Sequence, residues 1–224
     1  MSDPSVQPLD MFVMEGFAQR FQQVFGCAKC AFINQNDKTK VLDALFGQGK
    51  TLTYPYAYFV IQTTSVNNES YNPHQWVRRG IRIGVRSDDT IQMARIQPTN
   101  FDIEVTYVTN KFDSIEQGSV RAFVRRWLLA RRAGYLKFSV DYGLKQFGIG
   151  LTLAESINIP QRENIVEQET KYEITVLATI HGYISEPYTA KMGKTNQINV
   201  NAQIGGVNSQ IVSSQFFAFP TEEQ

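Results

Sequence analysis

The sequence predicts an α+β fold: a mostly antiparallel β-sheet with an N-terminal helix and one long amphipathic helix packed on it, plus an extended C-terminal arm. Near the N-terminus, apolar residues recur at helical spacing, as at Phe17, Phe21 and Val24. Apolar and polar residues alternate along 101–110, which is typical of a strand with one buried face. The last stretch is rich in Asn, Gln and Ser and too poor in apolar side chains to form its own core.

The chain length suits one sizeable domain with arms. We expect a flexible N-terminus over 1–10, an α+β domain over 11–187 and a polar extended arm over 188–224. The formal net charge of +1 gives no overall basic field that would favour nucleic acid. No stretch approaches 18 consecutive apolar residues, and the N-terminus lacks the pattern of a secretory signal. We therefore expect no membrane partner and synthesis in the cytoplasm.

The first part of the chain predicts a helix followed by strands. Residues 10–26 form an amphipathic pattern that ends at Gly26, a residue typical of helix C-termini. A short strand is expected around Ala31–Asn34. Two further strands, over 38–46 and 51–62, would be joined by a glycine-containing turn.

A long polar loop is expected over 64–80, before the next strands. Ile81, Ile83 and Val85 then alternate with arginine and glycine, which indicates a half-buried strand. Residues 101–110 give the clearest strand pattern in the chain.

A long amphipathic helix is predicted to follow. Ser114 and Gln117 fit a capping box at its start, and Gly134 is a plausible end. One stripe of the helix is apolar: Val120, Phe123, Val124 and Trp127. Another stripe is basic, with Arg121, Arg125 and Arg132 within roughly 40° of one another around the helix axis.

Two more strands are expected in the rest of the domain. The first covers 135–142 and leads into a turn-rich stretch over 148–161. The second covers 171–185, where apolar side chains alternate on one face: Tyr172, Ile174, Val176, Ala178 and Ile180.

The segment ALFGQGKT, residues 44–51, matches a loose phosphate-loop pattern. A functional loop requires a helix directly after Lys50, so that the helix N-terminus faces the phosphates. Here Pro55 and several β-branched and aromatic residues follow, which disfavour a helix. Ala44 also stands where a permissive glycine is needed. We interpret the segment as a turn leading into a strand, and keep a nucleotide-dependent enzyme acting through Lys50 and Thr51 as an alternative.

The sequence contains no convincing catalytic set. Cys27 and Cys30 form a CxxC pair, but a zinc site needs two more ligands, and the only histidines, His74 and His181, are isolated. We interpret both cysteines as reduced thiols and His181 as structural. The acidic clusters are interpreted as solvated turns and loops: Asp88 with Asp89, and Glu163, Glu167 and Glu169. We thus expect no enzymatic activity, no cofactor and no metal.

The basic stripe is the charged feature that stands above background. Arg121, Arg125 and Arg132 could pair with a neighbouring chain, remain a solvated face, or contact nucleic-acid phosphates, and we rank these hypotheses in that order. The arm carries alternating INVNAQI and an apolar FFAF. We therefore assign Arg121, Arg125, Arg132, Phe216, Phe217 and Phe219 to a predicted assembly interface.

The order of segments in residues 11–187 supports a family assignment. The three most informative stretches are Tyr54-Pro55-Tyr56-Ala57, the strand and helix joined by Asn110–Asp113, and Tyr172–Pro187 with Gly182-Tyr183 near the end of its strand. In pattern and order these residues resemble the tail terminator, or tail sheath stabiliser, family of T-even-type contractile-tailed bacteriophages. The arm lies outside this resemblance.

The resemblance implies a structural virion protein without an active site or cofactor. Such a protein forms a ring, of six copies in that family, which caps the tail tube and sheath, ends tail polymerisation and joins the tail to neck and head-completion proteins. DNA only passes through its lumen, and its place is the neck end of the tail. A different neck, head-completion or baseplate component is the alternative. The residues themselves leave the copy number and the surfaces that meet sheath, tube or neck open.

Overall fold

The computed structural model describes 7–33, 45, 53–66, 80–85, 90–113, 116, 118–158, 164–166, 169–191, 200–204 and 207–211. Within these residues the fold is α+β and mostly sheet. The helices are α1 (Leu9–Phe25) and α4 (Val120–Ala133). The strands are β1 (Lys29–Phe32), β2 (Tyr56–Val66), β3 (Ile81–Val85), β4 (Thr90–Thr109), β5 (Phe138–Tyr142), β6 (Lys145–Leu153), β7 (Asn164–Val166), β8 (Glu169–Lys191), β9 (Val200–Ile204) and β10 (Val207–Ile211).

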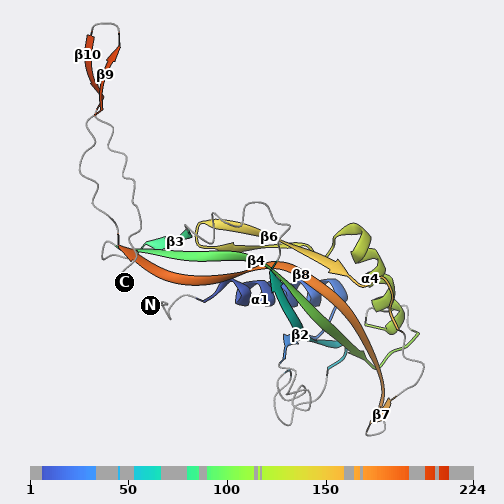
Figure 1. Cartoon of the computed structure of the whole chain (residues 1–224). Coiled ribbons are helices and arrows are strands. Elements are labelled where there is room, and N and C mark those ends of the chain that lie inside the picture. Colours follow the sequence, from blue (N-terminus) through green and yellow to red (C-terminus); the bar gives the residue numbers. More distant parts are fainter. Residues whose placement is uncertain are drawn as a thin grey trace.

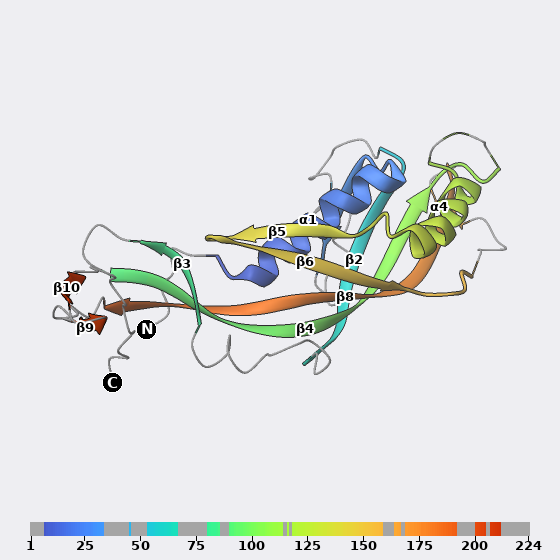
Figure 2. The same ribbon diagram turned by 90° about the horizontal axis from the view of Figure 1, so that it is seen from above.

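One curled sheet dominates the domain. Its strand order is β1-β2-β4-β8-β6-β5, with β3 also pairing with β4 and β7 with β8. All neighbouring strands are antiparallel except β1 and β2, so the sheet is mixed. The long strands β4 and β8 form a curved central ribbon, with α1 along its middle (Figure 1). The helix α4 and the strand β3 lie toward opposite ends of this ribbon (Figures 1 and 2).

The helix α1 confirms the amphipathic prediction. It ends at Gly26, which has a left-handed backbone (φ 68°) and donates its N–H to the Gln22 carbonyl at 2.8 Å. Its buried side chains recur every four residues along one face: Leu9, Val13, Phe17, Phe21 and Phe25. The helix begins at Leu9, so the boundary expected between residues 10 and 11 falls inside it.

Aromatic rings fill the core between the helices and the sheet. Phe59 of β2 meets Phe17 and Phe21 edge-on, each at 5.0 Å between ring centroids. Tyr107 of β4 stacks on Phe123 of α4 at 4.4 Å. Edge-to-face and offset stacked pairs of this kind contribute about 0.5–1.5 kcal/mol each beyond the burial of their surface. The core therefore joins α1, α4 and the sheet into one unit.

The strand β4 is longer than the sequence pattern predicted. Alternation was recognised over 101–110, but pairing with β8 extends from Thr109 back to Thr90. Pro98 interrupts the pattern and lacks a backbone N–H, so it reads as a strand end. In the structure, β3 pairs with β4 up to Ala94, and β2 pairs with β4 from Thr99 onward. Pro98 lies between these two stretches. A proline is tolerated in that gap.

The turn-rich prediction for 148–161 is wrong over its first part, because residues 145–153 form strand β6. Its glycines suggested turns. In the strand they alternate with Phe147, Ile149 and Leu153, which are buried, while Gly148 is exposed with no atom within 4 Å of where a Cβ would stand. The glycines thus occupy the opposite face of the strand, where no side chain is required for the core.

Other element boundaries also differ from the predictions. The strand expected over 51–62 begins at Tyr56 and runs to Val66. Within the strand expected over 38–46 only Leu45 is described, and it is helical. The strand β8 runs to Lys191, so the boundary expected between 187 and 188 falls inside it. Beyond it, β9 and β10 form an antiparallel pair.

Candidate interaction surfaces

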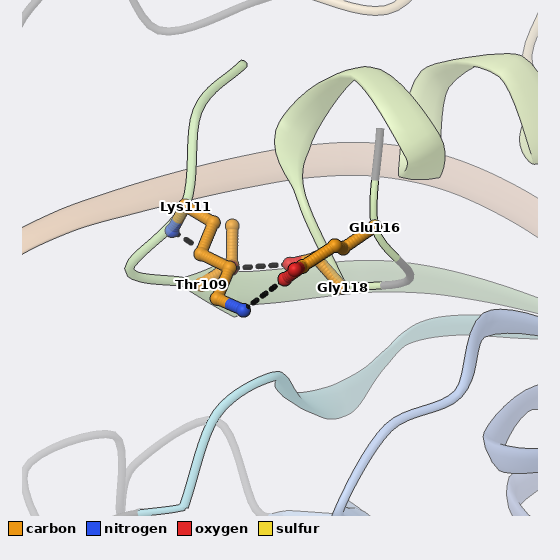
Figure 3. A network of polar contacts seen from close by, with 4 residues as sticks. All are labelled: Thr109, Lys111, Glu116 and Gly118. Carbon is orange, nitrogen blue, oxygen red and sulfur yellow. Dashed lines mark hydrogen bonds and ion pairs between the residues drawn. The ribbon is translucent and has the colours of Figure 1, made fainter. Parts of the chain in front are cut away.

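The connection between β4 and α4 is held by a small polar network (Figure 3). The Thr109 hydroxyl donates to the Gly118 carbonyl and accepts from the Lys111 N–H at 3.2 Å. The Lys111 ammonium pairs with Glu116 at 2.5 Å. Gly118 has φ 98°, and a Cβ there would lie 3.0 Å from Pro55. This network lies directly before the first residue of α4 and fixes the path of the connection.

The helix α4 starts at Val120, so the predicted capping box at Ser114 is wrong. The N-cap is Ser119, whose hydroxyl accepts the Ala122 N–H at 3.1 Å. The predicted end at Gly134 is confirmed, with φ 66° and its N–H bonded to the Ala130 carbonyl. The buried stripe consists of Val120, Phe123, Trp127 and Ala130, and Val124 packs against it.

The solvent side of α4 carries the three arginines predicted to share a stripe. Arg121, Arg125 and Arg132 are all exposed. Leu128 and Leu129 are exposed beside them, at 45% and 47%. At about 3.6 residues per turn these five residues span an arc of roughly 100°. We call Arg121, Arg125, Leu128, Leu129 and Arg132 the arginine face.

The arginines of α4 differ in their partners. Arg121 forms an ion pair with Asp113, which precedes the helix. On other sides of the helix, Arg126 donates to the Val24 carbonyl at 3.0 Å, and Arg131 pairs with Glu155. Within the described part of the chain, neither Arg125 nor Arg132 forms an ion pair.

A second surface lies on the side of the sheet that faces away from α1. In β4, the odd-numbered residues from Phe101 to Tyr107 face the core, so Asp102 and Glu104 face outward. Their partners across to β8 are Thr179 and Leu177. We call the outward side chains Tyr58, Gln62, Thr63, Asn100, Asp102, Glu104, Thr152, Glu173, Thr175, Leu177, Thr179 and His181 the outer sheet face.

Asp102 is held at the centre of this face by two hydroxyl groups. Thr63 of β2 and Thr179 of β8 each donate to one of its carboxylate oxygens, both at 2.7 Å. These hydrogen bonds lower the pKa of the Asp102 carboxyl from its ordinary value, because they stabilise the ionised form. The pairing of the strands therefore places two hydroxyl groups where they stabilise the negative charge of Asp102.

Glu104 and Glu173 lie on the same face as Asp102, and we call these three carboxylates the acidic row. Gln62 donates to Glu104 at 3.2 Å, and Tyr58 donates to Glu173 at 3.1 Å. Burial raises the pKa of the Tyr58 phenol to about 12, so it remains a neutral donor at physiological pH. Between these acids the Leu177 side chain is 61% exposed. The outer sheet face thus combines negative charge with an exposed apolar side chain.

His181 has a structural place on the same face. Its Nδ1 is hydrogen-bonded to the Asn100 side-chain oxygen at 2.8 Å, and its Nε2 to the Thr152 hydroxyl at 2.7 Å. The imidazole therefore links β4, β8 and β6.

The outer sheet face borders a partly open hollow of about 940 Å³. Its lining comes from β2, β4, β8, the end of β6 and the turn after α4. It carries both signs of charge, with Asp102 and Glu104 on the sheet and Arg131 and Lys137 at the helix end. Within this lining the Thr63 and Thr179 hydroxyls donate to the Asp102 carboxylate.

The cysteines lie close together but away from the surface. Cys27 is buried, Cys30 is half-buried, and both are free thiols. A hydrogen bond with Cys30 and burial raise the pKa of the Cys27 thiol, which keeps it protonated and unreactive. Among the described residues, no three His, Cys, Asp or Glu side chains lie close enough to hold a metal ion.

Several predicted residues lie outside the described parts of the chain. They are Phe216, Phe217 and Phe219 of the assembly interface, Ala44, Lys50 and Thr51 of the loose phosphate-loop pattern, Ser114, Gln117, His74, Asp88, Asp89, Glu163 and Glu167. Of the predicted interface, the structure thus places the arginines alone. The exposed leucines Leu128 and Leu129 and the acidic row were not among the predicted interface residues. The helical spacing of the leucines was a readable signal, whereas the acidic row depends on strand register.

No family model fits the chain, and no curated protein matches it. Within the described residues, none of the helices combines the length and the apolar character needed to cross a membrane.

Proposed function

We propose that this chain is a structural virion protein that forms a ring at the neck end of a contractile phage tail. The ring would cap the tail tube and sheath, end tail polymerisation and connect to neck proteins. It would act by presenting surfaces to copies of itself and to its neighbours, with DNA passing through the lumen. The arm that follows β8, including Phe216, Phe217 and Phe219, would dock on a neighbour.

The observation that carries this proposal is the position of the three segments that resemble the tail terminator family. The first leads into β2, the second covers part of β4 and the connection to α4, and the third lies in β8. The strands β2, β4 and β8 are direct neighbours at the centre of the sheet. Segments that are far apart in the sequence therefore form one continuous structural unit, as expected when a resemblance reflects a common fold.

The surfaces also support a role in assembly. A closed ring of identical subunits requires two different surfaces on each copy, one for each neighbour. The arginine face and the outer sheet face are two such surfaces, and both expose apolar side chains among charged ones. Fold alone does not determine role, so another neck, head-completion or baseplate component remains the competing proposal.

Electron microscopy of negatively stained particles tests the proposal. Purified protein is imaged alone and after mixing with tail tubes and sheaths. We expect rings of uniform diameter, seated at one end of the tubes. Rings that bind only portal or head-completion complexes would favour the competing proposal. Protein that forms no ring and leaves every tube end bare would contradict both.

A further inference from the structure

We propose that the arginine face of one subunit docks on the outer sheet face of the next. This inference rests on the proposed ring and names the two surfaces that would close it. The occupant of the outer sheet face is thus a second copy of this chain.

The two faces are complementary in charge. The arginine face presents Arg125 and Arg132, which form no ion pair within the described residues, and Arg121, which is paired with Asp113. The outer sheet face presents the carboxylates Asp102, Glu104 and Glu173. Arginine is suited to such a contact, because its planar guanidinium binds carboxylates through two parallel hydrogen bonds and is less strongly hydrated than lysine.

The two faces also match in apolar character. Leu128 and Leu129 lie among the arginines, and Leu177 lies between the carboxylates. Interfaces commonly have such an arrangement, with an apolar centre and a polar rim. A surface that bound only phosphates would have no use for exposed leucines. This observation favours a protein partner over nucleic acid for the arginine face.

The positions of the two faces fit a head-to-tail contact. The arginine face lies on the solvent side of α4, at one end of the β4–β8 ribbon (Figure 1). The outer sheet face lies along β2, β4 and β8, and the two faces share no residue. One copy can therefore use both faces at once, which is the condition for a heterologous interface that continues around a ring.

The test measures molar mass in solution by light scattering and sedimentation. The helix variant carries Arg125→Glu and Arg132→Glu, and the sheet variant carries Glu104→Lys and Glu173→Lys. Each variant should raise the dissociation constant for self-association at least about tenfold, since close charge pairs couple strongly across interfaces. Matched controls reverse exposed charges elsewhere: Arg82→Glu with Lys145→Glu, and Asp141→Lys. They should leave the mass unchanged.

Recombination of the variants makes the test specific. A chain with all four reversals should assemble again, because the reversed faces are complementary. Mixing the helix variant with the sheet variant should also restore assembly, since wild-type and reversed contacts can alternate. Restoration shows at the same time that each variant is folded. Raised salt should weaken the wild-type assembly, because the Debye length falls from about 10 Å at 0.1 M to about 3 Å at 1 M.

The possible failures are distinguishable. An oligomer that survives both reversals, or variants that never recombine, would overturn this docking and leave the proposed ring standing. Binding to duplex DNA is measured for the wild type and the helix variant. If the helix variant loses DNA binding while its molar mass is unchanged, the arginine face would be assigned to nucleic acid instead. A wild-type chain that remains monomeric at every concentration and leaves tube ends bare would overturn both the docking and the ring.

Discussion

At Gly143, the β5–β6 turn packs so closely against the backbone of β3 that a side chain would not fit between them. Its φ is 61°, in the left-handed region that disfavours residues with a Cβ. A Cβ built there would lie 2.4 Å from the Ile83 Cα and 2.6 Å from its carbonyl oxygen. Conformation and close packing therefore both require glycine at this position.

We predict that Gly143→Ala lowers the free energy of unfolding by about 1–3 kcal/mol, the typical cost of a strained backbone conformation. Urea unfolding measures the change. Gly148→Ala is the matched control on the same hairpin. Gly148 has no atom within 4 Å of its Cβ position, so this substitution should be neutral or slightly stabilising. Equal effects of the two substitutions would contradict the packing of the turn against β3.

The hydroxyl groups around Asp102 lead to a prediction about pH. They lower the pKa of its carboxyl in the folded state, so they stabilise the fold above the ordinary pKa of about 3.9. This contribution is lost as the pH falls through the lowered pKa. Thr63→Val with Thr179→Val should therefore raise the pKa of Asp102 and reduce stability at neutral pH, with the difference shrinking toward strongly acidic pH.

Two measurements check this prediction. Carboxyl resonances in an NMR titration report the pKa of Asp102, and urea unfolding across the acidic range reports stability. Thr175→Val is the control, because Thr175 is exposed on the same face of β8 and makes no hydrogen bond with Asp102. An unchanged Asp102 titration in the double variant would show that the hydroxyl groups do not set its pKa.

At the scale of elements, the start of α4 shows where local signals are insufficient. The sequence pattern placed the cap at Ser114, in a capping box with Gln117. The structure uses Ser119, because Gly118 packs on Pro55 and the Thr109 hydroxyl binds the Gly118 carbonyl. The contact between Gly118 and Pro55 joins residues far apart in the sequence, so a local pattern cannot reveal it.

Ser119 is fully buried at this cap, and its removal leads to a prediction about the element. Ser119→Ala should lower the free energy of unfolding by about 1 kcal/mol, because the Ala122 N–H loses its acceptor. Thermal or urea unfolding provides the measurement. Ser139→Ala, at an exposed position of β5, is the control and should change stability little. An equally small effect at Ser119 would show that the cap contributes nothing.

The other elements could be predicted where they depend on local sequence, and not where they depend on contacts with distant parts of the chain. The helix ends at Gly26 and Gly134 were correct, because a glycine C-cap depends on local backbone conformation. The strand β6 was missed because its glycines imitate turns, and β4 was predicted only over 101–110, where apolar and polar residues alternate. Both errors arise where a neighbouring strand decides whether a local signal is tolerated.

At the scale of the whole molecule, the sequence located one of two candidate surfaces. The arginine stripe follows from helical spacing alone, so it could be read directly. The outer sheet face requires Asp102, Glu104 and Glu173 to be brought together from two strands about 70 residues apart in the chain, by the register Asp102↔Thr179 and Val108↔Glu173. Only the paired strands define that surface.

The position at which the domain ends is also decided by strand pairing. A composition change led us to expect the domain to end at Pro187, but Tyr188–Lys191 still pair with Thr90–Met93 of β4. Ala190 is buried there, and the Tyr188 ring lies 5.2 Å from the Arg95 guanidinium. These contacts place the last residues of β8 within the sheet.

We therefore predict different results for two truncations. A chain that ends after Lys191 should keep the stability of the domain. A chain that ends after Pro187 loses the last part of the β4–β8 ladder, in which each hydrogen bond contributes about 0.5–1.5 kcal/mol net. Its free energy of unfolding should fall by about 2 kcal/mol or more, measured by urea unfolding at equal protein concentration. Equal stability of the two truncated chains would place the end of the domain at Pro187, as the composition indicated, and would assign Tyr188–Lys191 to the arm.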